Sequence, residues 1–180
     1  IKQLTMKKLI FSVLFVALAF GAQAQRKGEA QKLEGYKITD KDCVDVTPVK
    51  DQSRSGTCWS FSGTAFLESE ILKNGGEVVD LSEMWIVRHC YEQKAEKFVR
   101  LHGMLNFGQG GATHDVMNAI AEFGIVPEEV YRGLNYGSEK HNHYEVDALL
   151  RGYLEGVVKQ KTLSPAWKDG FNAILDVYFG

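Results

Sequence analysis

A cysteine at the start of a predicted helix constrains this chain more than any other feature. Cys58 follows a turn rich in serine and glycine, residues 53–56, and precedes residues that favour a helix as far as Lys73. Residues 74–76, Asn-Gly-Gly, then stop that helix. The amino end of a helix favours negative charge through its unpaired N–H groups and aligned peptide dipoles, and a thiol is nucleophilic only as the thiolate. The pattern therefore indicates a reactive thiol at residue 58.

Gln52 lies six residues before Cys58 and supplies a second polar group. When a thiolate attacks a carbonyl group, the oxygen gains negative charge, and losing one hydrogen-bond donor to it typically slows the reaction about 100- to 1,000-fold. The backbone N–H of Cys58 and the side-chain amide of Gln52 could supply two such donors. The alternative is that Cys58 is a small buried hydrophobic residue and Gln52 an ordinary loop residue. Spacing alone leaves both interpretations open.

Residues 46–61 favour the first interpretation, because they closely resemble the segment around the nucleophile of papain-like cysteine peptidases. The two motifs are Val46-Thr-Pro-Val-Lys-Asp-Gln52 and Ser55-Gly-Thr-Cys58-Trp-Ser-Phe61. The resemblance implies that Cys58 is the catalytic nucleophile and that Gln52 belongs to the oxyanion hole. Residues 81–83, Leu-Ser-Glu, resemble the opening of the family's second helix.

Residues 108–111, Gly-Gln-Gly-Gly, resemble the family's double-glycine loop, whose backbone pairs with the substrate chain. Gly110 and Gly111 have no side chain to block another backbone, so they are expected to bind a peptide as an added strand does. Two adjacent glycines by themselves would indicate only a flexible loop. The upstream cysteine motif therefore carries this expectation.

Ser55 and Gly108 stand where secreted papain-like enzymes usually carry a bridged pair of cysteines. Absence of both resembles the bleomycin hydrolase branch, which includes bacterial aminopeptidase C. The likeness continues through residues 91–105, 124–131 and 174–180. It implies an aminopeptidase that cleaves short peptides through a Cys58 thioester, and a homo-oligomer, a hexamer with an internal chamber. No cofactor is expected.

The resemblance implies the α+β papain-like fold, of which residues 46–180 are expected to form the mainly helical half. In papain relatives the histidine follows the cysteine by about 130–150 residues, at or beyond about residue 188 here. No histidine of this chain lies in a segment resembling the histidine motif. We therefore expect the N-terminal part of a longer enzyme, inactive or poorly active without the β-rich half that carries the catalytic histidine and asparagine. A catalytically inactive scaffold domain is the alternative, although intact Gln52 and Cys58 argue against it.

Residues 1–24 are expected to contain upstream residues and an export signal. Lys7 and Lys8 precede an apolar run, residues 9–20, and Ala22-Gln-Ala24 fits a cleavage site. The predicted location is periplasmic or extracellular. Since the run is shorter than the ~20 residues that span a bilayer, no stable membrane anchor is expected. Residues 25–45 are polar and predict a linker or extended arm, too short for the helical inhibitory propeptide of papain-type zymogens.

Composition agrees with one packed core and an ordinary surface. The 180 residues are 44% hydrophobic and 24% charged. Their formal net charge of −2 gives no electrostatic reason to expect a nucleic-acid partner, so a peptide substrate is the expected partner.

The remaining cysteines and a histidine pair each allow two interpretations. Cys43 and Cys90 could form a bridge, but two buried free thiols are preferred because spacing cannot establish geometry. His141 and His143, with Glu145 nearby, could bind zinc. A closed zinc site needs about four ligands, so a solvated polar turn is preferred and no metal is expected.

Apolar residues at helical spacing predict the other helices. One has Ser82 as its N-cap and extends its apolar stripe through Leu101 and Leu105; a short one ends at Gly124. A further helix covers residues 149–158. The last begins with Ser164 as N-cap and a proline as its first helical residue.

Overall fold

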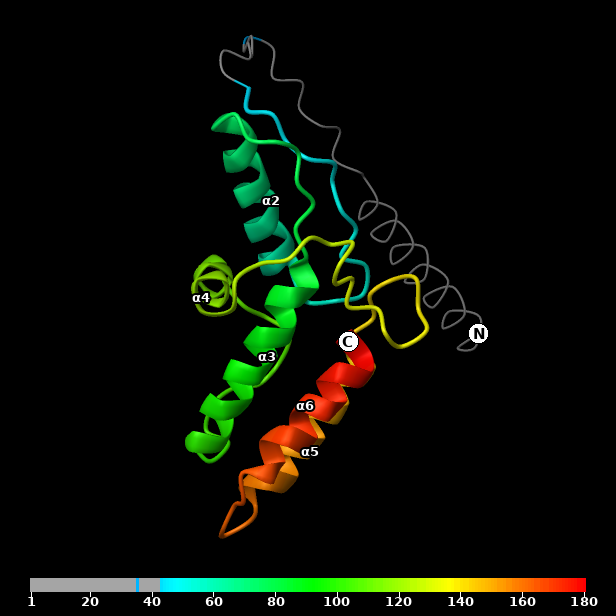
Figure 1. Cartoon of the computed structure of the whole chain (residues 1–180). Coiled ribbons are helices and arrows are strands. Elements are labelled where there is room, and N and C mark those ends of the chain that lie inside the picture. Colours follow the sequence, from blue (N-terminus) through cyan, green and yellow to red (C-terminus); the bar gives the residue numbers. More distant parts are fainter. Residues whose placement is uncertain (1–34, 36–42) are drawn as a thin grey trace, which may run out of the picture. The chain divides into compact units, whose positions relative to one another are not determined.

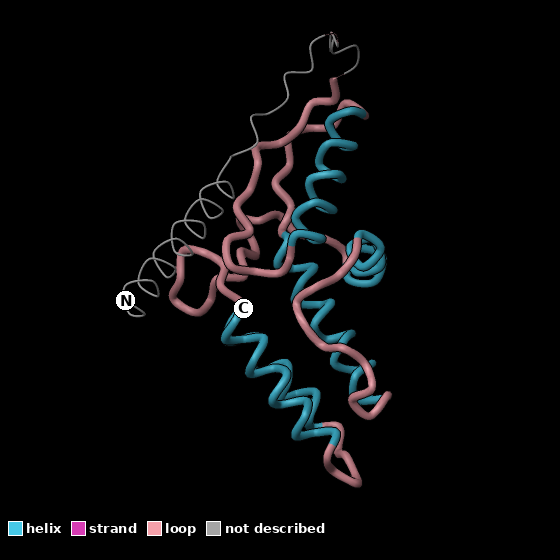
Figure 2. The backbone as a smooth tube through the Cα atoms, turned by 180° about the vertical axis from the view of Figure 1, so that it is seen from behind, coloured by secondary structure: helices cyan, strands magenta, loops and turns pink. Residues whose placement is uncertain are grey.

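The computed structural model describes residue 35 and residues 43–180, and helices dominate this part of the chain (Figure 1). The described residues contain no strand (Figure 2). Isolated bridges join Arg54 to Asn142 and Leu81 to Pro127. The predicted export signal and most of the predicted arm lie outside them. No described helix has the length and apolar character needed to cross a bilayer. The helices are α2 Cys58–Lys73, α3 Glu83–Arg100, α4 Thr113–Phe123, α5 Tyr144–Val158 and α6 Ala166–Phe179.

Helix α3 is the centre of the packing, because it contacts α2, α4, α5 and α6. Helices α5 and α6 lie side by side as a helical hairpin, seen from opposite sides in Figures 1 and 2. Full burial of a large apolar side chain stabilises a fold by about 1.5–3 kcal/mol. The apolar stripe predicted on α3 lies in the core from Met84 to Phe98. The largest fully buried side chains include Met84, Ile86, Phe107, Leu150, Leu154, Phe171 and Leu175.

Local sequence signals set most helix boundaries. Helix α2 covers the predicted range, and Gly75, just beyond it, has φ 79°. Ser82 caps α3 as predicted, since its side-chain oxygen accepts the Trp85 N–H at 3.0 Å. Helix α4 ends before Gly124, which has φ 75°. Glycine adopts this left-handed conformation without a Cβ clash, so these two ends follow from residue type.

Helix α3 is shorter than its apolar spacing predicted. It ends before Leu101, and Leu101 and Leu105 are exposed rather than packed on its core face. His102 and Gly103 have φ values of 50° and 78°, and the Gly103 N–H donates to the Phe98 carbonyl at 2.9 Å. These two left-handed residues close the helix before the apolar pattern ends.

Helix α6 starts one residue later than predicted, at Ala166. Pro165 is the N-cap, and no side chain caps the helix, so Ser164 does not have the predicted role. The Pro165 carbonyl accepts the N–H of Lys168 at 3.1 Å and thereby makes the first turn. A helix start is therefore possible here without a polar side-chain cap.

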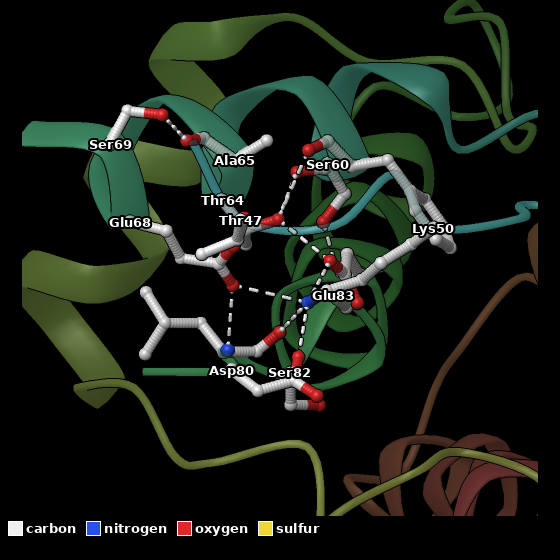
Figure 3. A network of polar contacts seen from close by, with 12 residues as sticks. Thr47, Lys50, Ser60, Thr64, Ala65, Glu68, Ser69, Asp80, Ser82 and Glu83 are labelled. Atoms are coloured by element: carbon white, nitrogen blue, oxygen red, sulfur yellow. Dashed lines mark hydrogen bonds and ion pairs between the residues drawn. The ribbon is translucent and has the colours of Figure 1, made fainter. Parts of the chain in front are cut away.

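A buried charge network joins the segment before α2 to helices α2 and α3 (Figure 3). Lys50 Nζ lies 3.1 Å from Glu68 Oε1, 2.8 Å from Glu83 Oε1 and 2.5 Å from Asp80 Oδ1. Glu68 and Glu83 are 0% and 3% exposed. Buried carboxylates are rare without a partner, so Lys50 neutralises charge that the core could not otherwise hold.

Hydroxyl groups complete this network. Thr47 donates to Glu68, and Thr64 Oγ1 donates to Glu83 Oε1 at 2.9 Å. Burial acts to lower the pKa of the Lys50 ammonium, but its hydrogen bonds to Asp80 and Glu83 outweigh that effect and raise the pKa. Lys50 is therefore a permanent cation at neutral pH, and it fixes the approach of the chain to α2.

All three cysteines are free. Cys90 is buried, as predicted, and burial raises the pKa of its thiol to about 11. The expectation of a buried thiol is wrong for Cys43, which is exposed. Cys43 lies in the segment before α2, outside any helix.

Candidate functional site

Cys58 is the first residue of α2, and it is exposed. Thr57 is the N-cap, but no side chain caps the helix. The Thr57 hydroxyl is instead buried and lies 2.6 Å from Ser55 Oγ. The N–H groups at this helix end therefore lack a side-chain acceptor. The Cys58 thiol is accessible, at a position where the helix dipole favours negative charge.

Gln52 is oriented by reciprocal hydrogen bonds with Ser55. Its Nε2 donates to the Ser55 carbonyl at 2.7 Å, and Ser55 Oγ donates to the Gln52 carbonyl at 2.8 Å. Ser53, between them, has φ 51°, and its N–H donates to Asp51 Oδ1 at 2.8 Å. These bonds give the Gln52 amide a defined orientation. One of its two side-chain N–H bonds remains for another acceptor.

Gln109 joins the double-glycine loop to the start of α2. Its Oε1 accepts the Gly56 N–H at 2.7 Å, and its carbonyl oxygen accepts the Trp59 Nε1–H at 2.9 Å. The structure therefore brings together two segments that the sequence connected only through a family resemblance. Gln109 itself gave no signal in the sequence, because its role depends on a contact 53 residues away.

The two predicted substrate-binding glycines differ in their surroundings. A Cβ on Gly111 would lie 2.5 Å from a ring carbon of Trp59, so this glycine lets the loop pack against the residue that follows Cys58. A Cβ on Gly110 would meet no atom within 4 Å. Gly111 therefore serves close packing, whereas the space beside Gly110 is open.

Lys94 of α3 contacts the same loop. Its Nζ donates to the carbonyl oxygens of Gly110 at 2.5 Å and Gly108 at 3.3 Å, and it lies 5.3 Å from the centroid of the Trp59 ring. Helical spacing places Lys94 among the polar residues between the apolar positions of α3. No pattern in the sequence distinguishes it from its solvated neighbours.

An open pocket of about 360 Å³ lies beside these loops. It is lined by residues 53–56, residues 106–110 without Phe107, and Tyr144, Asp147 and Arg151 of α5. Arg151 Nη2 lies 4.0 Å from Asp147 Oδ2. Burial raises the pKa of Asp147, although the positive charge of Arg151 opposes this effect. The pocket is therefore polar and carries charges of both signs.

The predicted solvated turn is wrong for His143, which is fully buried. The backbone N–H of His143 donates to the Arg54 carbonyl at 3.1 Å, and the backbone N–H of Arg54 donates to the His141 carbonyl at 3.0 Å. The His143 ring lies edge-on to Phe179, with centroids 5.2 Å apart. Burial and the neighbouring His141 lower the pKa of His143 to about 4, so it packs as a neutral ring. Among the described residues, no three histidine, cysteine or carboxylate side chains group as a metal site requires.

Residues 34–167 match the profile of the papain family cysteine proteases, which is well over half of the chain. The chain belongs to the papain family of cysteine proteases. The family predicted from residues 46–61 is thereby confirmed, and membership agrees with the papain-like fold expected for the chain.

Several cysteine proteases are similar to parts of the chain. Cysteine proteinase 1 of Entamoeba histolytica is 32% identical over 138 residues, 72% of this chain and 40% of its own length. The cathepsin L-like peptidase of Aedes aegypti is 52% identical over 42 residues, 23% of this chain and 12% of its own length. Cathepsin L2 of Homo sapiens is 48% identical over 42 residues, 23% of this chain and 13% of its own length. The chain thus spans less than half the length of these relatives.

Proposed function

We propose that the full-length protein is a cysteine peptidase with Cys58 as its nucleophile. The exposed thiol at the uncapped amino end of α2 carries this proposal. The Cys58 thiolate attacks the carbonyl carbon of a peptide bond, the C–N bond breaks, and the amine leaves with a proton. Water then hydrolyses the thioester and releases the acid and the thiol. By family resemblance, a histidine takes up the thiol proton and delivers it to the amine.

Gln52 is proposed to donate a hydrogen bond to the oxyanion that forms during this attack. Its fixed amide and remaining N–H bond support the assignment. The backbone N–H of Cys58 is the second proposed donor. Replacing Gln52 with alanine should then lower kcat about 100- to 1,000-fold, because the oxyanion would lose one preorganised donor.

The loop at Gly110 and Gly111 is proposed to pair with the backbone of the substrate. The open space beside Gly110 supports this assignment, because an extended chain needs such space to approach. The contact of Gly111 with Trp59 places the loop next to the residue that follows the nucleophile.

Alkylation of the full-length protein by iodoacetamide tests the assignment of the nucleophile. Cys43 is a matched internal control, since it is exposed but does not begin a helix. We expect Cys58 to react roughly tenfold faster than Cys43 at pH 6.5, with peptide mass spectrometry reporting each site. A Cys58→Ser variant should lose both the fast labelling and the peptidase activity. Equal rates at the two exposed thiols would contradict the proposal.

The finer proposal is an aminopeptidase of the bleomycin hydrolase type. Ser55 and Gly108 support it, since they replace the usual cysteine pair. The two loops are joined by hydrogen bonds beside these positions, since Gln109 accepts from the Gly56 N–H and from the Trp59 Nε1–H. The names of the cathepsin L relatives support the competing assignment, a cathepsin L-type peptidase.

Peptides with free and acetylated amino ends distinguish the two assignments. An aminopeptidase should release single residues from the free peptide and leave the acetylated one intact. Internal cleavage of both peptides would instead favour the cathepsin L-type assignment. A hexamer in analytical ultracentrifugation would support the bleomycin hydrolase branch, whereas a monomer would argue against it.

Export to the periplasm or the cell exterior is also proposed, from the basic, apolar and small-residue pattern of residues 7–24. Amino-terminal sequencing of the mature protein should begin at Gln25. A mature protein that retains residues 7–24 would contradict processing at this site.

A further inference from the structure

Lys94 is a half-buried cation that no carboxylate neutralises directly. Within the described residues it forms no ion pair, and its hydrogen bonds go to two backbone carbonyl oxygens of the double-glycine loop. Its ammonium also lies 5.3 Å and 6.0 Å from the ring centroids of Trp59 and Tyr91. Burial lowers the pKa of Lys94. Such a cation is stable only where carbonyl dipoles and aromatic faces replace its water, so its contacts constrain the loop.

The bond from Lys94 to the Gly110 carbonyl orients a whole peptide plane. In a trans peptide, the N–H of the next residue points opposite to the carbonyl oxygen. Because the Gly110 oxygen is directed to Lys94 Nζ at 2.5 Å, the Gly111 N–H points away from the ammonium. This N–H has no acceptor among the described residues. This N–H can therefore donate a hydrogen bond to a group outside the described residues.

The same ammonium connects the loop to the start of α2. Trp59 lies under Lys94 and donates its Nε1–H to the carbonyl of Gln109 at 2.9 Å. Gly111 lies against the other atoms of the same indole, where a Cβ would be 2.5–3.0 Å from three of its carbons. A shift of Lys94 would therefore move the loop and the residue next to Cys58 together.

We propose that Lys94 is a positioning residue of the peptidase, which holds the Gly110–Gly111 peptide plane so that the Gly111 N–H can donate to a carbonyl oxygen of the substrate chain. This inference rests on the proposed function, because it assigns a partner to the peptide-binding loop. Lys94 contacts no substrate itself. Its effect is on the recognition of a peptide, not on the intrinsic reactivity of the thiol.

Amide hydrogen exchange in the free protein tests the positioning directly. Lys94→Met should speed exchange in a peptide fragment covering residues 108–112 at least fivefold, because the loop loses both carbonyl contacts. Lys94→Arg should restore most of the protection. Lys97→Met is the matched control, since Lys97 is an exposed lysine on the same helix, and it should change nothing. Unchanged exchange in Lys94→Met would overturn the inference whether or not the protein is a peptidase.

Labelling of Cys58 by two reagents tests the consequence for function. A peptidyl chloromethyl ketone requires chain recognition, whereas iodoacetamide does not. Lys94→Met should lower the ratio of the chloromethyl ketone rate to the iodoacetamide rate about tenfold. The iodoacetamide rate itself should stay within twofold of wild type. Lys94→Arg should partly recover the ratio. An unchanged ratio in a folded Lys94→Met protein would overturn the inference. If Lys94→Met does not fold, Lys94→Gln replaces it in both measurements. Faster exchange and a lower ratio in Lys94→Gln would support the inference, and an unchanged ratio would overturn it.

Discussion

Alanine at the two adjacent glycines should separate packing from substrate recognition. At residue 111 the new Cβ would lie 2.5, 2.7 and 3.0 Å from three ring carbons of Trp59, which is 6% exposed and cannot move into solvent. Overpacking of this kind costs about 1–3 kcal/mol. At residue 110 the Cβ meets nothing within 4 Å, and the backbone is outside the left-handed region. The free energy of unfolding should therefore change by less than about 0.5 kcal/mol there.

Urea unfolding and peptidyl labelling measure the two effects on the full-length protein. Gly111→Ala should lower the free energy of unfolding by about 2 kcal/mol. Gly110→Ala should keep its stability but label with a peptidyl chloromethyl ketone roughly fivefold more slowly. Its methyl group would stand where the substrate approaches, and a lost hydrogen bond is worth about 1 kcal/mol.

Two results would refute this reasoning. If Gly110→Ala were as destabilised as Gly111→Ala, the space beside residue 110 would not be open. If Gly110→Ala were stable and recognised peptides like wild type, the loop would not be a peptide-binding element. Labelling by iodoacetamide, which needs no chain recognition, is the control and should be equal in wild type and Gly110→Ala.

The charge network of Figure 3 and its neighbour Glu128 yield two further predictions. Lys50→Met should lower the free energy of unfolding by about 3 kcal/mol at pH 7, because Glu68 and Glu83 would stay buried without a counter-charge. Lys73→Met removes an exposed ion pair and is the control. It should lower the free energy of unfolding by less than about 0.5 kcal/mol in the same urea titration. Burial and the charge of Glu83 raise the pKa of Glu128 from 4.5 to about 7. Ionisation of Glu128 therefore costs no folding stability below about pH 4.5. The loss of stability grows as pH rises and is complete above about pH 7. Glu128→Gln should therefore be more stable than wild type by about 1 kcal/mol at pH 8, after allowance for solvent screening, and the difference should vanish near pH 4. Glu129 is an exposed neighbour, so Glu129→Gln is the control and should show no such pH dependence. A gain in stability of Glu128→Gln that does not depend on pH would contradict the assigned cause.

Much of the candidate site could be anticipated, because its first elements are local. The turn before Cys58, the helix that begins there and the Ser82 cap all depend on residues within one or two turns of the chain. The family was also readable from residues 46–61 and agrees with the matched profile. Apolar spacing identified the core face of α3, but it extended the helix into Leu101 and Leu105, because periodicity does not register the left-handed turn at residues 102 and 103.

The sequence by itself determined where the helices lie and which thiol begins one of them, since capping and helical propensity act between near neighbours. Only the tertiary structure decided which polar residues matter around that thiol. Three residues of types usually found on the surface have such roles: Lys94, Gln109 and the buried His143. Their roles arise from partners 14 to 89 residues away in the chain. Burial of a polar group depends on the packing of whole helices, and no local pattern specifies which distant carbonyl or ring will replace its water.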